Sequence, residues 1–454
     1  MTSLAFELTL ILRARLTLAA LLLLLALSAL AVWSGLHEVE RQHQAIARVQ
    51  PLGEQDVASV ARRYPHSPDG GQPAYYTFYT TWDAPSDAAF MAIGLRDVAP
   101  YVLRVRALGL QAQLYEGETF NPELALAGRF DYAFVLIYLA PLFVIALLHD
   151  LVSGERQSGR LRLLLSLPGG ARLWRRRVGL RAGLVFACLG LPLLLAAPVA
   201  GMPAAGLALA LSVSAAYLAF WTGLCLLVGT RGWQSVTNAT ALMGSWAILT
   251  LVLPALANVA LMRAIPVHQG VDLMLAQRQA VHGAWEVPRE DTMRRFLAGH
   301  PEWQGTAPLP AGFHYKWYFA FHQLGDESVA AQVRDYRAGL MARQAWTGRL
   351  GWILPGVGAQ AILHRLADTD LPAQLAYQDR IADFHREIRT FYYGYLFNDR
   401  PFGQADYAKR PVFAPRAPAP ALPWGGVAAM AVLSMAVLGL GLARLHRLRL
   451  LARG

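Results

Sequence analysis

The sequence predicts an α-helical polytopic membrane protein with six transmembrane helices, both termini inside, a mixed α/β outer domain and a mainly helical outer domain. Of its 454 residues, 55% are hydrophobic and only 16% are charged, against about 25% charged in soluble domains. Six windows contain no Asp, Glu, Lys or Arg, and they cover residues 16–36, 132–148, 182–200, 207–228, 239–262 and 424–443. Each has the length that a helix needs to cross a bilayer, ~17–25 residues. This pattern excludes a soluble globular protein, a disordered chain and a disulfide-stapled one.

Positive charge concentrates in short segments on one side of the six windows. The loop 149–181 carries eight arginines against two carboxylates, and the tail 444–454 adds four arginines. The N-terminal segment 1–15, predicted to be amphipathic, has two arginines against one glutamate, whereas the opposite short loop 201–206 has no charge. Because cytoplasmic loops are rich in Lys and Arg, we assign the basic segments to the cytoplasm and expect a bacterial inner-membrane protein. No basic excess is left elsewhere, so the net charge of +11 indicates contact with the lipid bilayer and no nucleic-acid partner.

This orientation places two long segments, 37–131 and 263–423, on the extracytoplasmic side. The only two cysteines, Cys188 and Cys225, lie in the third and fourth windows, so disulfides cannot stabilise the outer domains. The first window also resembles a cleavable signal peptide, because arginines precede a Leu-rich stretch and an Ala-Leu-Ala site. Its apolar run continues to Leu36, which is longer than a signal core and favours a retained anchor.

The outer segments show the following local patterns. In the first, we expect a helical continuation of the first span over 38–63, a strand over 75–82 and partly alternating residues over 102–115. In the second, we expect helices over 273–282, 289–297, 326–349 and 372–396, breaks at 355–356 and 398–401, and an extended linker over 411–423. Aromatic residues crowd 313–321 and 391–397. We interpret them as domain core or interfacial anchors in preference to a substrate gate at the outer mouth.

The sequence lacks the residues that several kinds of activity require. Ion-coupled transporters bind the driving ion with ionisable residues at membrane depth, and the six windows contain no acidic or basic residue of that kind. A phosphate-binding loop needs a Gly-Lys pair, but the only two lysines, Lys316 and Lys409, follow Tyr and Ala. The twelve histidines lack metal-ligand spacing, and no Gly-x-Ser-x-Gly elbow occurs. We therefore expect no catalytic residue, no metal and no bound cofactor in this chain.

One specific constellation follows the second window, over residues 150–168. Its pattern predicts one surface helix. We expect Ser153 to cap the start of this helix and Pro168 to end it. Leu161, Leu164 and Leu165 fall at i, i+3 and i+4 on one face of this helix, and Arg160 and Arg162 lie outside that stripe. Two interpretations stay open: an amphipathic helix that binds anionic lipid, or a rigid cytoplasmic knob that a motor subunit pushes.

The pattern Glu155-x-x-x-Gly159-x-Leu161-x-x-Leu164-x-Ser166-x-Pro168 resembles the coupling helix of type 2 ABC-transporter permeases. In that family, Thr is common where Arg160 stands here. Further likeness lies at 94–101, 121–124, 128–131 and 138–142, and it indicates the subgroup with large outer insertions after spans one and five. The residues that the resemblance implies for ATPase coupling are Glu155, Gly159, Arg160, Leu161, Leu164, Ser166 and Pro168.

The resemblance also implies partners. Such a permease pairs with a second copy or a paralogue, and the pair binds cytoplasmic ABC ATPase subunits that carry ATP and Mg²⁺. Its usual activity is export across or out of the inner membrane. An alternative is a non-transporting mechanotransmitter whose outer domains act on an envelope partner. A plain membrane anchor for a binding domain ranks last, because it needs no coupling helix.

Overall fold

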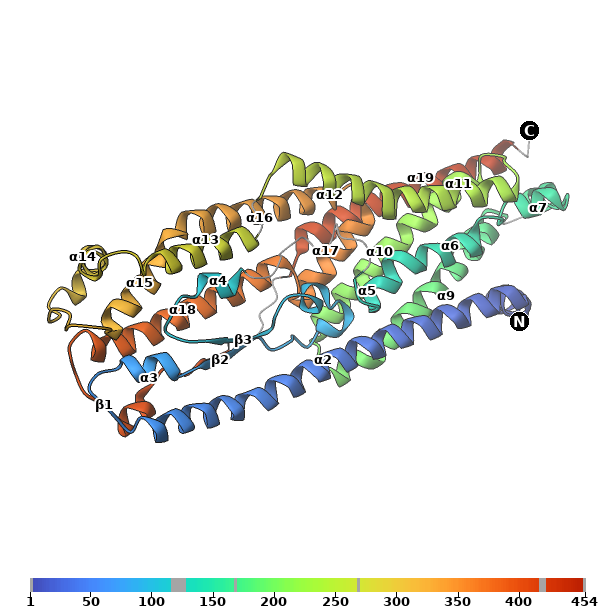
Figure 1. Ribbon diagram of the computed structural model, residues 1–454. Helices are drawn as coiled ribbons and strands as arrows, with labels where there is room; N and C mark the ends of the chain where they lie inside the picture. The colour runs from blue at the N-terminus through green and yellow to red at the C-terminus, as the bar shows by residue number, and fades with distance from the viewer. Residues whose placement is uncertain (1–2, 116–127, 167–169, 268–269, 416–421, 452–454) are drawn as a thin grey trace.

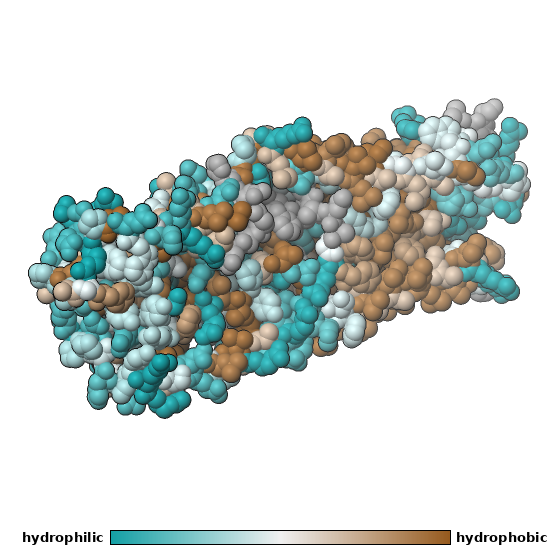
Figure 2. All heavy atoms as spheres, viewed as in Figure 1, coloured by the Kyte–Doolittle hydropathy of each residue, from teal (hydrophilic) through white to brown (hydrophobic). Residues whose placement is uncertain are grey.

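The molecule is elongated, and its two ends differ in character. The computed structural model describes residues 3–115, 128–166, 170–267, 270–415 and 422–451. Both termini lie at one end, and the long helix α2 (Arg15–Arg63) runs from there along most of the length (Figure 1). Hydrophobic side chains dominate the surface over the half that contains the termini, whereas hydrophilic ones cover the opposite end (Figure 2). The apolar half is therefore suited to lipid and the opposite end to water.

Six helices in the described part of the chain are long and apolar enough to cross a membrane. After the short α1 (Ser3–Arg13), they are α2; α5 (Tyr132–Phe134), a π-helical segment (Val135–Leu139) and α6 (Ala140–Leu148); α9 (Gly170–Val199); α10 (Ala204–Gly229); α11 (Ser235–Ala247), a second π-helical segment (Ile248–Val252) and α12 (Leu253–Ala264); and α19 (Trp424–Leu451). They cover the six uncharged windows, except that α9 stops one residue before the third window ends. The chain is a helical multi-pass membrane protein, as predicted.

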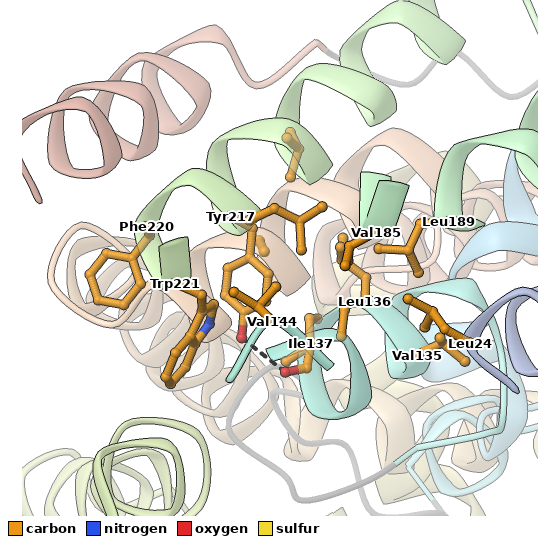
Figure 3. Packing of buried hydrophobic residues seen from close by; sticks show 14 of the residues in the cluster. Leu24, Val135, Leu136, Ile137, Val144, Val185, Leu189, Tyr217, Phe220 and Trp221 are labelled. Carbon is orange, nitrogen blue, oxygen red and sulfur yellow. Dashed lines mark hydrogen bonds between the residues drawn. The ribbon is translucent and has the colours of Figure 1, made fainter. Parts of the chain in front are cut away.

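The second span and α10 form the centre of this six-helix bundle. In each, 61% of the most apolar stretch is buried, against 11% in the fifth span and 17% in α19. The hydroxyl of Tyr217 in α10 donates a hydrogen bond of 2.9 Å to the carbonyl of Ile137, in the first π-helical segment (Figure 3). Since both residues are buried, this bond satisfies the hydroxyl and fixes the second span to α10.

Helices α10 and α19 touch at backbone distance. A Cβ built at Gly223 would lie 2.6 Å from the Cα of Leu438, and one built at Gly441 would lie 2.7 Å from the carbonyl oxygen of Gly223. Small residues at a crossing allow this approach, which is the usual way in which membrane helices gain packing contacts. The crossing therefore depends on glycine at both positions.

Helix α17 (Pro355–Ala367) follows the fifth span in the sequence but packs inside the bundle. Its Ile362 and Leu363 belong to the same buried cluster as the spans. Near the end of α17, Leu366 lies beside Gly206 at the start of α10, with 3.6 Å between Leu366 Cδ1 and a Cβ built at Gly206. The ends of the spans that lie away from the termini thus surround a helix that does not itself cross the membrane.

The start of α17 corrects one expectation. The sequence predicts a break at Pro355-Gly356, whereas Pro355 is in the first turn of a 13-residue helix. Proline fits this position, because the first N–H groups of a helix have no partner within the helix. A Pro-Gly pair therefore marked a helix start here and not a turn.

The lobe is formed by the second half of α2, residues 64–115 and residues 270–415 apart from α17. Its strands are β1 (His66–Ser67), β2 (Tyr79–Trp82), β3 (Val102–Val105) and β4 (Phe402–Gly403). Its helices, beside several 3₁₀ turns, are α3 (Gly71–Tyr76), α4 (Gln111–Leu114), α13 (Gly270–Gly283), α14 (Arg289–Gly299), α15 (Tyr315–Ser328), α16 (Ala330–Leu350) and α18 (Leu371–Leu396).

Both outer segments share the core of this lobe, although the sequence suggested two domains. Strand β1 pairs antiparallel with β4, and β2 pairs antiparallel with β3. The hydroxyls of Tyr79 and Tyr392 lie 2.9 Å apart, and both rings are buried. Asp326 accepts hydrogen bonds of 3.0 Å from the backbone N–H of Leu110. Residues from both segments therefore build one folded unit.

The lobe confirms several predicted elements and changes others. The helical continuation over 38–63 is the second half of α2, and the helices over 273–282, 289–297 and 372–396 are found. The strand over 75–82 is shorter, because α3 includes its first two residues. The helix over 326–349 is interrupted at Val329, between α15 and α16. Most of the aromatic residues over 313–321 and 391–397 lie in the lobe core, as the domain-core interpretation expects.

Candidate functional site: the loop between the second and third spans

The loop that carries the predicted coupling residues lies at the end of the molecule that holds the termini (Figure 1). It forms two short helices, α7 (Ser153–Gln157) and α8 (Leu161–Ser166). The expected single helix is wrong, because Gly159 between them has φ +74°. The side chains of Leu165 and Ser166 and all of Pro168 lie outside the described residues. The other predicted residues fall on α7, on α8 or between them.

Gly159 ends α7 by backbone geometry. Its N–H donates to the carbonyl of Arg156 at 3.0 Å, and the N–H of Arg160 donates to that of Glu155 at 3.0 Å. A left-handed glycine in this place is a common way to satisfy the last carbonyls of a helix. A Cβ built at Gly159 would meet no atom within 4 Å. The need for glycine therefore comes from its φ and not from crowding.

The start of α7 is attached to the fifth span, and Ser153 is not the expected cap. Val152 occupies the cap position, and no side chain caps the helix. The hydroxyl of Ser153 instead lies 2.8 Å from that of Ser235, the first residue of α11, which also donates to Gln157 at 3.1 Å. Because Ser153 is buried, its hydroxyl needs a hydrogen-bond partner, and the hydroxyl of Ser235 on the neighbouring helix provides one.

Glu155 joins three parts of the chain through ion pairs. Its Oε2 lies 2.9 Å from Nε of Arg160, and its Oε1 lies 2.9 Å from Nη1 of Arg177 in α9. The Nε of Arg177 lies 3.2 Å from Oε2 of Glu7 in α1. The side chains of Glu7, Glu155 and Arg177 are only 9%, 17% and 16% exposed, so water screens these pairs less than surface pairs. We call these four residues the Glu155 network.

Helix α8 has an inner and an outer face. Leu161 and Leu164 are half-buried and pack against the hydrophobic cluster of the bundle, which confirms the predicted stripe for these two residues. Arg160 and Arg162 are exposed, and Leu163 is 64% exposed. An exposed leucine beside arginines forms a surface that a protein partner can cover. The outer face thus presents Arg160, Arg162 and Leu163.

Sequence reasoning missed three residues of this site. Arg177 lies in the run of three arginines at 175–177, and Glu7 is the only acidic residue in a basic terminal segment. An isolated acid among arginines was the available signal for the ion pair. For Leu163, the signal was its place between Arg162 and the inward-facing Leu164.

The arrangement is suited to transmitting movement between helices. Among the described residues, no group of three or more His, Cys, Asp or Glu is placed to hold a metal ion. The loop is instead fixed to α9 and α11 by directional polar contacts, and α9 is joined to α1 through the same Arg177. A displacement of α7 therefore reaches α9 and α11 through direct contacts and α1 through Arg177.

Comparison with known proteins gives one match. A family model described as a domain of unknown function (DUF3526) matches residues 272–416. No curated protein and no solved structure matches the chain. The matched segment runs from α13 to just beyond the last 3₁₀ turn of the lobe and includes α17, so it does not cover the loop described above.

Proposed function

We propose that this chain is the membrane-spanning permease subunit of an ATP-binding cassette exporter in a bacterial inner membrane. Separate cytoplasmic ATPase subunits hydrolyse ATP with Mg²⁺, and a second permease copy or paralogue completes the membrane unit. The arginine-rich end faces the cytoplasm and the lobe faces the other side of the membrane. The transported substrate crosses or leaves the membrane when the spans move.

The observation that carries this proposal is the loop between the second and third spans. Its sequence from Glu155 to Ser166 has the spacing of a coupling helix, and its exposed face carries Arg160, Arg162 and Leu163. The Glu155 network connects it to α1 and to the third span, and Ser153 connects it to the fifth. A motor that pushes on this face therefore acts on several spans at once.

The source of energy supports an external motor. The uncharged windows leave no acidic or basic residue to bind a driving ion at membrane depth. Neither lysine follows glycine, as the phosphate-binding loop of an ATPase requires. Movement of a substrate by this chain would thus need a partner that supplies the energy.

A mechanotransmitter is the second candidate, and the continuity of α2 favours it. This helix has 49 residues and passes without interruption from the bundle into the lobe. Inside the bundle, α17 connects the spans to the lobe a second time. These two rigid connections suit a protein that moves its lobe against an envelope partner without transporting a substrate.

The test is purification of the tagged full-length chain from native membranes, identification of the ATPase that accompanies it, and measurement of ATP hydrolysis. We expect Leu163→Asp to remove the ATPase, because it places a charge in the apolar centre of the docking face. Leu52→Asp is the matched control. Leu52 is similarly exposed, at 55%, but lies on α2 in the lobe, so its complex should stay intact.

Retention of the ATPase by Leu163→Asp at the level of the parent would refute docking at this face. To separate the two candidate functions, the purified complex is examined for a ligand and for ATP-dependent transport into inverted vesicles. A complex with normal ATP hydrolysis, no ligand and no transport would favour the mechanotransmitter.

A further inference from the structure

The turn between α16 and α17 lies beside a membrane span, although its neighbours in sequence belong to the lobe. Leu354 and Val357 are buried against Leu249, Ala257 and Leu261 of the fifth span. The stretch 350–364 has no Asp, Glu, Lys or Arg, and 15 residues are too few to cross a bilayer but suit a re-entrant segment. The chain therefore enters the apolar layer at this turn and leaves it along α17.

The depth of the turn follows from α10. Gly356 lies near the hydroxyl of Tyr217, with 3.7 Å between that oxygen and a Cβ built at Gly356, whereas Leu366 lies near Gly206 at the start of α10. Eleven residues of helix separate Gly206 from Tyr217, a rise of about 16 Å, which is roughly half of a 30 Å hydrocarbon core. The exposed side chains of the turn therefore face lipid.

A groove of about 380 Å³ opens beside this turn, where α16 and α17 meet the starts of α18 and α19. Its apolar wall includes Trp352, Ile362 and Gly426, and its polar wall includes Arg349, Arg365 and Asp370. Trp352 is 59% exposed and its neighbour Ile353 is 73% exposed. The groove is thus continuous with apolar surface on one side and carries positive charge on the other.

Arg349 gives the groove its charge. Its guanidinium lies 4.7 Å from the ring centroid of Trp346, and it makes no ion pair in the part of the chain that the structure describes. Arg365 is paired with Asp370 at 3.3 Å, and Asp370 also caps α18. Arg349 shares the groove with Arg365, whose neighbour Leu366 lies beside Gly206 at the start of α10, so its long side chain reaches toward the boundary of the apolar layer. An arginine without a counter-ion beside an apolar layer is costly. The groove therefore has a net positive charge that an anion would neutralise.

We infer that this groove binds an anionic amphiphile, a phosphate-bearing lipid of the leaflet next to the lobe. Its phosphate lies between Arg349 and Arg365, where arginine pairs with it in bidentate geometry. One acyl chain lies against Trp352 and Ile362, in contact with the exposed face of α19. The site depends only on the chain's being a membrane protein and not on docking of an ATPase.

The test is native mass spectrometry of the full-length chain in neutral detergent, titrated with dioleoylphosphatidylglycerol and, separately, with dioleoylphosphatidylcholine. We expect the anionic lipid to bind more tightly. Arg349→Gln should weaken its binding about tenfold, the loss expected for one charge-assisted contact. Ala361→Leu, which fills the groove without changing its charge, should weaken both lipids.

Arg334→Gln is the matched control, because Arg334 is exposed on the same helix but outside the groove, about 22 Å away along α16. It should bind the anionic lipid like the parent. Equal binding by Arg349→Gln and the parent would overturn the site. Competition by inorganic phosphate at the same concentration would show an anion site without a lipid. A change from dimer to monomer in Arg349→Gln or Ala361→Leu would assign the groove to a second copy of this chain.

Discussion

Glu155 is the residue at which α1, α7 and α9 meet, because it shares Arg177 with Glu7. Replacement by Gln keeps the shape but removes the charge, and leaves two arginines with one fewer carboxylate in a half-buried place. We expect Glu155→Gln to destabilise the purified chain by about 1–3 kcal/mol, seen as a lower midpoint of thermal unfolding. Asp383→Asn is the control, since Asp383 and its partner Arg386 are 65% and 75% exposed and such pairs contribute little. Equal midpoints for both variants would contradict the role of the network.

Because of His385, we expect the stability of the lobe to fall in mild acid. Its Nε2 lies 3.0 Å and 2.8 Å from the carbonyl oxygens of Arg106 and Leu108, and burial, with the nearby charge of Arg389, lowers its pKa well below the ordinary value. The unfolded chain takes up a proton at this residue near pH 6.5 and the folded chain does not. Each pH unit below 6.5 therefore removes about 1.4 kcal/mol of stability.

The variant His385→Gln isolates this contribution, because its amide donates to the same carbonyls but does not titrate. We expect the parent to lose about 2 kcal/mol more than the variant between pH 7 and pH 5, measured as the difference between their unfolding midpoints at each pH. Parallel loss of stability in the two proteins would show that this histidine titrates normally in the folded state.

Whole elements were predictable where one physical demand dominated the sequence. A span must be apolar over its whole length, so the six windows identified six helices. The interruptions inside elements were not predictable in this way. The leucines after Gly159 have helical spacing in the sequence, but Ser158, Gly159 and Arg160 lie outside both helices, and Gly159 has φ +74°. Hydropathy likewise does not mark the two π-helical segments; in the first, the carbonyl of Ile137 accepts a hydrogen bond from the hydroxyl of Tyr217 in α10.

The crossing of α10 and α19 depends on glycines, and the close approach that they allow cannot be deduced from hydropathy. Gly223→Ala would place a Cβ 2.6 Å from the Cα of Leu438, so the helices must separate. We expect a loss of about 1–3 kcal/mol, the usual range for overpacking a core, measured as the thermal midpoint in detergent. Gly439→Ala is the control on α19, because a Cβ there would meet no atom within 4 Å. If both variants melt together, the helices do not cross at Gly223.

The arrangement of the whole molecule was only partly accessible from the sequence. Charge asymmetry suggests which segments share a side, but it carries no information on how residues more than 300 positions apart fold together. The paired hydroxyls of Tyr79 and Tyr392, and the pairing of β1 with β4, join such segments into one lobe. The same holds for the loop, where Glu155 was predicted, whereas Glu7, which shares Arg177 with it from nearly 150 positions away, was not.

We expect the two ends of the molecule to face opposite sides of the membrane in cells. Leu52 in the lobe and Leu163 in α8, which follows α7, are exposed, and apolar surface covers the part of the molecule between the lobe and α7 (Figures 1 and 2). With Cys188 and Cys225 replaced by Ala, a membrane-impermeant maleimide should label Leu52→Cys in spheroplasts. It should label Leu163→Cys only after the membrane is permeabilised. Because ATP is confined to the cytoplasm, labelling of position 163 in sealed spheroplasts would place α8 beyond the reach of any ATPase.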